Sequence, residues 1–461
     1  MFAPEVYRER RDRLYRNVGG GVLMLSGHAQ SPVNFAANHY PFRQDSSFLY
    51  YVGLDQPDYL LLADIDRGRE TLYGPEPSLD DAVWAGPRAS LAACAARSAI
   101  THTEPLDRAS AAVAGMLKGG RRLHYLPAYR ADQVLRLSRL LAISPGQVGC
   151  GASLDFVRAV VAQRSIKTAQ EVAEIESALG LCRNLFRALV QHLPRETTAL
   201  SLAGILEGVV RAAGRRLAFP PIVTTRGEIL HGKPDTTALR PGDLLLMDIG
   251  TESGEHYASD ITRTVPVGGR FQARQKAIYD IVLAAQKAAI AAAAPGVPFL
   301  TLHRLAAGVI CEGLRSLGLM RGRVDDAVAA GAHALFFPHG LGHMLGLDAH
   351  DMESLGEDHV GYDNETVRSD QFGLAALRLG RRLEAGFVVT VEPGIYFIPA
   401  LIDRWRQEKR CASFIAFEKL APYRGFGGVR IEDVILITAD GARVLGPVIP
   451  KTAATVEAAC A

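Results

Sequence analysis

The sequence predicts an α/β amino-terminal domain followed by a larger domain of mixed helices and strands. Over the first 150 residues, short apolar strands alternate with helices. A segment rich in Gly, Ser and Pro at residues 143–151 then interrupts this pattern. A long helix follows, with Thr168 and Glu171 in the spacing of a capping box. We therefore place a boundary near residue 160, which divides the 461 residues into domains 1–160 and 161–461.

The elements of the first domain are predicted from apolar runs bounded by glycine and from charged, periodic stretches. In chain order they are a helix at 5–16, strands at 19–27, 46–54 and 59–67, helices at 80–98 and 110–118, a strand at 121–126, and a helix at 128–141. The histidines of this domain are isolated from one another, so we expect structural roles for them.

The second domain contains longer periodic helices around a central hairpin. The predicted elements are helices at 169–191 and 198–213, a strand at 219–227, a hairpin at 244–267, and helices at 273–293 and 300–317. Later β-branched runs at 387–397 and 427–438 predict two further strands.

Composition narrows the classes of partner. Lys and Arg number 51 against 49 Asp and Glu, so no strong basic field suggests nucleic acid. No run of about 18 apolar residues suggests a membrane span. The six cysteines are scattered without CxxC pairs, which favours reduced thiols and a cytoplasmic location. A small molecule or peptide is the expected partner.

The central hairpin carries two carboxylates on neighbouring strands. Asp248 ends the apolar run LLLMDIG, and Asp260 opens the next strand after a Ser-Gly turn. Buried carboxylates are normally paired, protonated or bound to a metal, and no Lys or Arg lies between these two. A metal is favoured, although aspartates near turns are also commonly solvated or capping.

A glycine-rich segment, FFPHGLGHMLGLDAHD, adds His339, His343 and His350. The spacing of the first two matches that of a helical zinc-protease pair, but the intervening glycines disfavour a helix and no glutamate follows the first histidine. The glycines instead allow the backbone to pass close to a bound group. A core turn with structural histidines is the alternative.

Two apolar strands each contain an acid. Glu392 lies in FVVTVEPGIYF, and Glu432 lies in GGVRIEDVILIT two residues after Arg430. A structural ion pair explains either acid alone, but four carboxylates and a histidine in one domain are better explained by metal ligation. Such a donor set suits a pair of divalent ions, manganese first, with cobalt, zinc or iron as substitutes. Two ions could bridge and deprotonate a water that attacks a carbonyl.

This arrangement resembles the proline-specific metallopeptidases, prolidase and aminopeptidase P, over essentially the whole chain. PFRQDSSFLYYVG is similar to their amino-terminal domain, and the remainder to their catalytic domain, whose pita-bread (creatinase and methionine aminopeptidase-like) fold is α+β. The resemblance implies a two-metal site whose ligands are Asp248, Asp260, His343, Glu392 and Glu432. It also implies that Glu392 carries the proton from the water to the leaving nitrogen.

The resemblance implies further roles outside the ligand set. His231 in ILHG, His339 and His350 match histidines that line the substrate site and support the carbonyl and the tetrahedral intermediate, and Arg430 matches an arginine beside the second glutamate. A homodimer or homotetramer is also implied. One departure concerns the two aspartates, which are twelve positions apart where the family usually has eleven. Since a one-residue slip turns a side chain to the other face, we predict that the turn absorbs the extra residue.

The substrate is predicted to be an Xaa-Pro dipeptide. The insert at 353–386 resembles prolidase, and within it Arg378 occupies the position of an arginine that binds the free carboxylate of a dipeptide. A solvated helix face is the alternative for this arginine, because Arg381 and Arg382 lie nearby. Xaa-Pro aminopeptidase activity on short or longer peptides is the second hypothesis, and a non-catalytic binding module of the same fold is the third.

Overall fold

The computed structural model describes residues 1–193 and 198–460, which divide into two compact units. The first unit comprises Met1–Arg164 and Glu353–His359, and the second comprises Ser165–Met352 and Val360–Ala461. The assignment of domains 1–160 and 161–461 stays a proposal. None of the helices described is long and apolar enough to cross a membrane.

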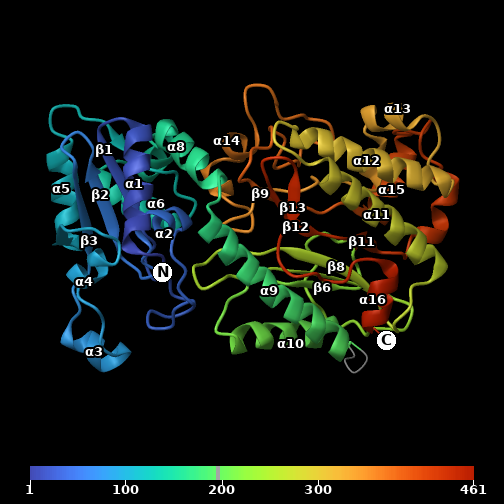
Figure 1. The fold of residues 1–461 in the computed structure, drawn as a ribbon, viewed down its shortest axis with the longest axis horizontal. Coiled ribbons are helices and arrows are strands. Elements are labelled where there is room, and N and C mark those ends of the chain that lie inside the picture. Colours follow the sequence, from blue (N-terminus) through green and yellow to red (C-terminus); the bar gives the residue numbers. More distant parts are fainter. Residues whose placement is uncertain (194–197, 461) are drawn as a thin grey trace. The chain divides into compact units, whose positions relative to one another are not determined.

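The first unit is built on a five-stranded sheet of order β4-β3-β2-β1-β5 (Figure 1). Its outer pairs, β3 with β4 and β1 with β5, are parallel, whereas the inner pairs are antiparallel. The strands are β1 (Val22–Ser26), β2 (Leu60–Asp64), β3 (Arg69–Gly74), β4 (Thr103–Pro105) and β5 (Leu123–His124). The helices are α1 (Pro4–Val18), α2 (Ser46–Val52), α3 (Leu79–Ala85), α4 (Leu91–Ala96), η1 (Leu106–Arg108), α5 (Ala109–Met116), α6 (Ala131–Leu141), α7 (Pro145–Cys150) and α8 (Leu154–Ser165).

A core cluster joins this sheet to the helices that cover it. Met24, Leu62 and Tyr73 on the strands pack with Val113 of α5 and Leu137 of α6, all nearly inaccessible to solvent. The alternation of strands and helices predicted for this region is therefore confirmed.

Two predicted elements of the first unit are wrong. The strand expected at 46–54 is helix α2, because the Asp45 side chain accepts a hydrogen bond from the Phe48 amide and caps the helix. The helix is buried on every side, so its continuous apolar sequence carried no helical periodicity. The single helix expected at 80–98 is divided into α3 and α4, because Gly86 adopts a φ of +83° and Pro87 follows it.

The second unit contains two pairs of packed helices and three small sheets (Figure 1). Helices α9 (Ala169–His192) and α10 (Ala199–Ala212) pack together, as do α11 (Ala273–Ala292) and α12 (Phe299–Ser316). The sheets have the orders β6-β7-β8, β10-β11 and β13-β12-β9. The strands are β6 (Ile222–Thr224), β7 (Leu244–Ile249), β8 (Ile261–Pro266), β9 (Val388–Val391), β10 (Gly394–Tyr396), β11 (Gly428–Arg430), β12 (Asp433–Ile437) and β13 (Ala442–Val444). The other helical elements along the chain are α13 (Val324–Ala329), η2 (Ala332–Leu335), η3 (Glu353–Leu355), α14 (Glu357–Gly361), α15 (Pro399–Gln407), η4 (Phe417–Lys419), η5 (Ala421–Tyr423) and α16 (Ala453–Cys460).

The start of α9 shows how local sequence sets this fold. Thr168 and Glu171 form the predicted capping box, each side chain bonding the other residue's backbone amide. Just before it, the Lys167 ammonium pairs with Asp351 at 3.0 Å, and both side chains are 1% exposed. This buried ion pair ties the beginning of α9 to the segment that carries His350.

Candidate metal centre

The β7–β8 hairpin brings the two aspartates to one face. Asp248 lies opposite Thr262, and Asp260 is two residues before Thr262 on the partner strand. Since alternate residues of a strand share a face, both carboxylates point the same way. The same register continues to a bridge between Glu252 and Ala258, which leaves residues 253–257 for the tip. The twelve-residue spacing therefore keeps both carboxylates on one face of the hairpin, while absorption of an extra residue by the turn stays a prediction.

His343 is positioned by a segment that runs beside β9. The Thr390 amide donates to the His343 carbonyl at 3.0 Å, and the His343 amide donates to Thr390 Oγ1 at the same distance. This approach requires glycine at 342, where a Cβ would lie 2.1 Å from the Thr390 carbonyl oxygen. The His343 Nδ1 donates to the Met344 carbonyl at 3.1 Å, because a carbonyl can only accept. The Nε2 lone pair is then left facing the carboxylates.

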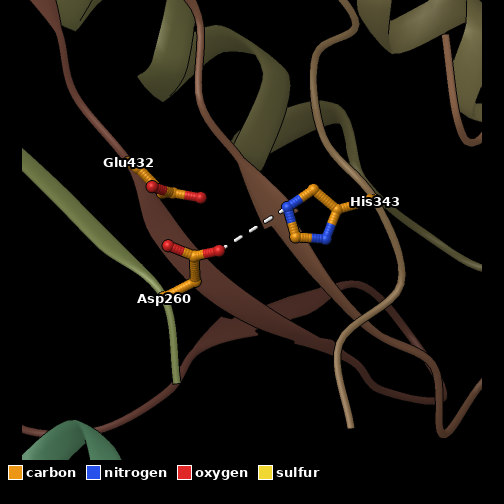
Figure 2. A group of neighbouring side chains, drawn as sticks. All are labelled: Asp260, His343 and Glu432. Carbon is orange, nitrogen blue, oxygen red and sulfur yellow. Dashed lines mark ion pairs between the residues drawn. The ribbon is translucent and has the colours of Figure 1, made fainter. Parts of the chain in front are cut away.

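The carboxylates surround that lone pair. His343 Nε2 lies 3.7 Å from Asp260 Oδ2 and 3.4 Å from Glu392 Oε1. Asp260, His343 and Glu432 each offer a donor atom within 4.8 Å of the others' donor atoms, and Figure 2 shows their side chains converging. Glu392 lies beside these residues. The β9–β12 register pairs Val391 with Asp433, and one further step along both strands places Glu392 opposite Glu432.

The electrostatics of this cluster fit a cation. Burial raises the pKa of Asp260 well above its usual value, with further increases from Glu432 and Asp248. Burial also raises the pKa of Glu432, and it raises that of Glu392 to about 7. Buried oxygens of Asp248 and Asp260 have no hydrogen-bond partner among the described residues. Divalent ions would satisfy these oxygens and neutralise the clustered carboxylates, and the oxygen-rich set with one imidazole suits them.

A chain of hydrogen bonds leads from Asp248 through Arg430 and Tyr396 to His339. The buried Arg430 guanidinium donates to Asp248 and, at 3.1 Å, to the Tyr396 hydroxyl. His339 Nδ1 donates to the Gly340 carbonyl at 2.7 Å, so its Nε2 accepts from the Tyr396 hydroxyl at 2.8 Å. Burial lowers the pKa of His339 to about 3, with Arg430 adding to the effect, so the imidazole is neutral.

Comparisons with known proteins decide the family. The model of metallopeptidase family M24 matches residues 173–439, and that of the aminopeptidase P N-terminal domain matches residues 7–125. The chain belongs to metallopeptidase family M24. Its two-part architecture is accordingly an α/β aminopeptidase P-like N-terminal domain and an M24 catalytic domain of the pita-bread fold.

Individual relatives span nearly the whole chain. The Xaa-Pro dipeptidase of Homo sapiens is 31% identical, with 98% of this chain and 91% of the relative covered. A probable Xaa-Pro aminopeptidase of Fusarium vanettenii is 33% identical, with 91% and 87% covered. Among solved structures, Pseudomonas aeruginosa aminopeptidase PepP has a TM-score of 0.80 at 29% identity, with 100% of this chain and 98% of that chain covered. Zinc-substituted Escherichia coli aminopeptidase P in complex with product has a TM-score of 0.80 at 26% identity, with the same coverage.

Three predicted substrate residues lie around the M24 metal centre. The His350 ring meets that of His343 at a centroid distance of 4.4 Å. His231 is exposed, yet close enough to His339 to contribute to the lowering of its pKa. Arg378 is half-buried and contributes to the lowered pKa values of His339 and His343. The roles assigned to these residues stay predictions.

The backbone around Arg378 is held by contacts within its insert. The Gly380 and Arg381 amides both donate to the Gly361 carbonyl, at 2.8 and 2.9 Å. Gly361 lies so close that a Cβ there would be 1.8 Å from the Arg378 carbonyl oxygen. The backbone that carries Arg378 is therefore held in place by close contacts within the insert.

A buried arginine joins β8 to the segment between β11 and β12 that carries Glu432, where the strand predicted at 427–438 is interrupted. Arg263 donates through Nη1 to the carbonyls of Thr262 and Glu432, at 2.9 and 2.6 Å, and through Nη2 to Asp433 at 2.7 Å. Its Nε donates to the Pro450 carbonyl at 2.9 Å. The two bonds through Nη1 therefore fix the spacing between the backbones of Thr262 and Glu432.

Sequence reasoning missed several residues that support the site. Tyr396 bonds both His339 and Arg430, and the Thr262 hydroxyl donates to Glu432 at 2.7 Å. Both residues lie in strongly apolar or β-branched stretches, where tyrosine and threonine are ordinary strand residues. A signal was present for Thr262, because it lies two positions after Asp260 and shares its face.

Proposed function

We propose that this M24 metallopeptidase cleaves the Xaa-Pro bond of dipeptides. The observation that carries the proposal is a cationic Arg378 beside a cluster of four carboxylates and His343. A metal-binding cluster is required for hydrolysis, and a nearby guanidinium suits the free carboxylate that a dipeptide carries next to its scissile bond. The relatives named Xaa-Pro dipeptidase support the same choice.

The proposed ligands are Asp248, Asp260, His343, Glu392 and Glu432. When bound, two divalent ions would supply an activated water and an electrophile for the scissile carbonyl. The fixed tautomer of His343 keeps its Nε2 available as a donor to a cation. Thr262, through its bond to Glu432, orients that carboxylate toward Asp260.

Glu392 is suited to carry the proton in this reaction. Its carboxylate lies within the cluster, 3.4 Å from His343 Nε2, where it can accept a proton from the attacking water and release it to the proline nitrogen. Burial raises its pKa to about 7 in the metal-free protein, and metal loading would lower that pKa, since a nearby cation favours the carboxylate. We assign His231 and His350 to substrate binding. His339 is assigned to support of the carbonyl and the intermediate, with its imidazole held by Tyr396 and, through it, by Arg430.

Xaa-Pro aminopeptidase activity is the second candidate. The two solved structures described above, which match the chain over its whole length, are of aminopeptidase P, and the Fusarium vanettenii relative is named a probable Xaa-Pro aminopeptidase. The two activities differ in the group on the carboxyl side of proline, since a dipeptide ends there in a carboxylate and a longer peptide continues with an amide. Arg378 favours the first, because an amide cannot accept both hydrogen bonds of the guanidinium.

The experiment compares Ala-Pro with Ala-Pro-Ala at equal concentrations of manganese-loaded enzyme. The dipeptidase proposal expects the larger kcat/KM with Ala-Pro, whereas a larger value with Ala-Pro-Ala supports the aminopeptidase alternative. Activity that survives complete chelation contradicts a metal-dependent reaction, and a fully loaded protein inert on both substrates contradicts Xaa-Pro hydrolysis altogether.

We further propose manganese as the native metal, with cobalt, zinc or iron as substitutes, a homodimer or homotetramer in solution, and a cytoplasmic location. The donor set supports manganese, because carboxylate oxygens predominate over nitrogen. Elemental analysis of the purified protein tests the metal, and sedimentation equilibrium tests the assembly.

A further inference from the structure

The backbone just before Arg378 packs against the segment of the metal centre that carries His339. A Cβ at Gly340 would lie 3.1 Å from Leu377 Cδ1 and 3.2 Å from Leu377 Cα, so the two segments are in close contact there. The Leu377 side chain is only 1% exposed. The position of Leu377 therefore fixes where the next residue, Arg378, leaves the backbone relative to the proposed substrate site.

The carbonyl of Leu377 is held by two side chains of the same insert. The Tyr362 hydroxyl donates to this carbonyl oxygen at 2.6 Å, and Arg368 Nη1 donates to it at 3.3 Å. Arg368 Nη1 also donates to the Ala375 carbonyl at 3.0 Å. Since a hydrogen bond weakens as its atoms separate, Tyr362 makes the stronger contact with the Leu377 carbonyl.

The aromatic ring of Tyr362 has further contacts within the insert. The Arg368 guanidinium carbon lies 4.7 Å from the centroid of the ring, in a cation–π contact. A Cβ at Gly380 would lie 3.2 Å from Tyr362 Cε1, so the ring packs closely on this glycine. Tyr362 therefore contacts the chain both before and after Arg378, at Leu377 and at Gly380.

Arg378 needs a fixed backbone if it is to bind a carboxylate. Two parallel hydrogen bonds between a guanidinium and a carboxylate require a defined distance and orientation. The long side chain already loses rotational freedom when it binds, and a mobile backbone would add to that loss. A residue that holds both Leu377 and Gly380 therefore strengthens binding of the carboxylate through Arg378.

We propose that Tyr362 is a positioning residue for Arg378 and thereby determines specificity for a free carboxylate next to the scissile bond. Its hydroxyl holds the Leu377 carbonyl and its ring holds the backbone at Gly380, so that the guanidinium reaches the carboxylate of a dipeptide. A substrate whose proline ends in an amide gains nothing from this arrangement. This role rests on the proposed Xaa-Pro dipeptidase function.

The role is tested with Tyr362→Phe, which keeps the ring and removes the hydroxyl. The substrates are Ala-Pro and alanyl-prolinamide, which differ only in the group that Arg378 is proposed to bind. The variant should raise the KM for Ala-Pro by about fivefold, as expected for the loss of one hydrogen bond, and leave kcat within about twofold. The KM for alanyl-prolinamide should also stay within about twofold, because this substrate has no carboxylate.

Tyr125→Phe is the matched control. Tyr125 lies in the first unit, and its buried hydroxyl donates to the Val148 carbonyl at 2.8 Å. This substitution removes the same kind of hydrogen bond and should leave the kinetics with both substrates unchanged. All variants are assayed as the manganese-loaded full chain, with folding checked by circular dichroism.

Two further variants separate positioning from a general structural effect. Because Tyr362 acts through Arg378, Tyr362→Phe should raise the KM for Ala-Pro no further in an enzyme that already carries Arg378→Ala. Arg368→Met removes the second donor to the Leu377 carbonyl and should also raise the KM for Ala-Pro selectively.

The outcomes distinguish this role from the function on which it rests. Independent effects of Tyr362→Phe and Arg378→Ala, or an equal rise of the KM for both substrates, overturn the positioning role while Xaa-Pro hydrolysis stands. A manganese-loaded wild-type enzyme that is inert on both substrates overturns the proposed function, and the positioning role with it.

Discussion

Replacement of Arg378 by alanine tests whether this residue selects dipeptides. The side chain is half-buried, and its charge contributes to the lowered pKa values of His339 and His343, so it lies at the metal centre. A hydrogen bond to a charged group contributes about 1.5 to 3 kcal/mol. Loss of the clamp should therefore lower kcat/KM for Ala-Pro by about 10- to 150-fold.

Arg381→Ala is the matched control for this substitution. Arg381 belongs to the same insert, but its guanidinium pairs with Glu384 at 2.7 Å. Its removal should change kcat/KM for Ala-Pro less than threefold, about 0.7 kcal/mol, because Glu384 already holds this guanidinium. Steady-state kinetics with Ala-Pro and Ala-Pro-Ala provide the comparison. An Arg378→Ala enzyme whose KM for Ala-Pro equals that of the wild type would refute the clamp.

Three further predictions concern the support of the site. Tyr396→Phe unpairs His339 and should lower kcat/KM by about 5- to 150-fold, since an unpaired buried group costs about 1–3 kcal/mol. Unchanged kinetics would contradict this prediction. The raised pKa of Glu392, about 7, means that the chelated folded state holds a proton which the unfolded chain releases near pH 4.5, so this group alone should lower stability between these pH values by about 3 kcal/mol, and the raised pKa values of Asp260 and Glu432 act in the same direction. Urea unfolding at pH 5 and pH 7 measures that loss, which manganese should abolish, and equal chelated stabilities would exclude it. Lys167→Met removes the buried ammonium that pairs with Asp351 and should cost about 3–5 kcal/mol in denaturant unfolding, with much of the loss recovered in Lys167→Met/Asp351→Asn; a loss below about 1 kcal/mol refutes this.

The sequence predicted correctly those helices that keep one face exposed to solvent, because capping residues and an amphipathic pattern mark them. The capping box at Thr168 and the amphipathic pattern of α12 placed their helices within a residue or two, because surface helices retain a polar face. Helix α2 was not predicted, since burial on every side removes that face and leaves an apolar run typical of a strand.

The sequence identified the acids of the candidate site but not the residues that support them. Carboxylates within apolar runs stand out in a sequence, so Asp248, Glu392 and Glu432 could be identified from the order of residues alone, although the structure places both glutamates between strands. The bond from Tyr396 to His339 spans 57 positions and depends on where β10 meets the segment that carries His339. No local pattern contains that information, because tyrosine in a strand is common whether or not its hydroxyl has a partner.

The contacts of Arg263 have a consequence for how the protein matures during synthesis. This side chain bonds the Glu432 carbonyl and also the Pro450 carbonyl, 187 positions along the chain. Chains emerge from the ribosome amino-terminus first, at about 5–20 residues per second, and domains generally fold in that order. The hairpin that carries both aspartates is therefore synthesised long before Pro450, whose carbonyl accepts a hydrogen bond from Arg263. Metal acquisition should accordingly be a late event in biogenesis, and nascent chains stalled before residue 450 should fail to retain the ions that the completed polypeptide holds.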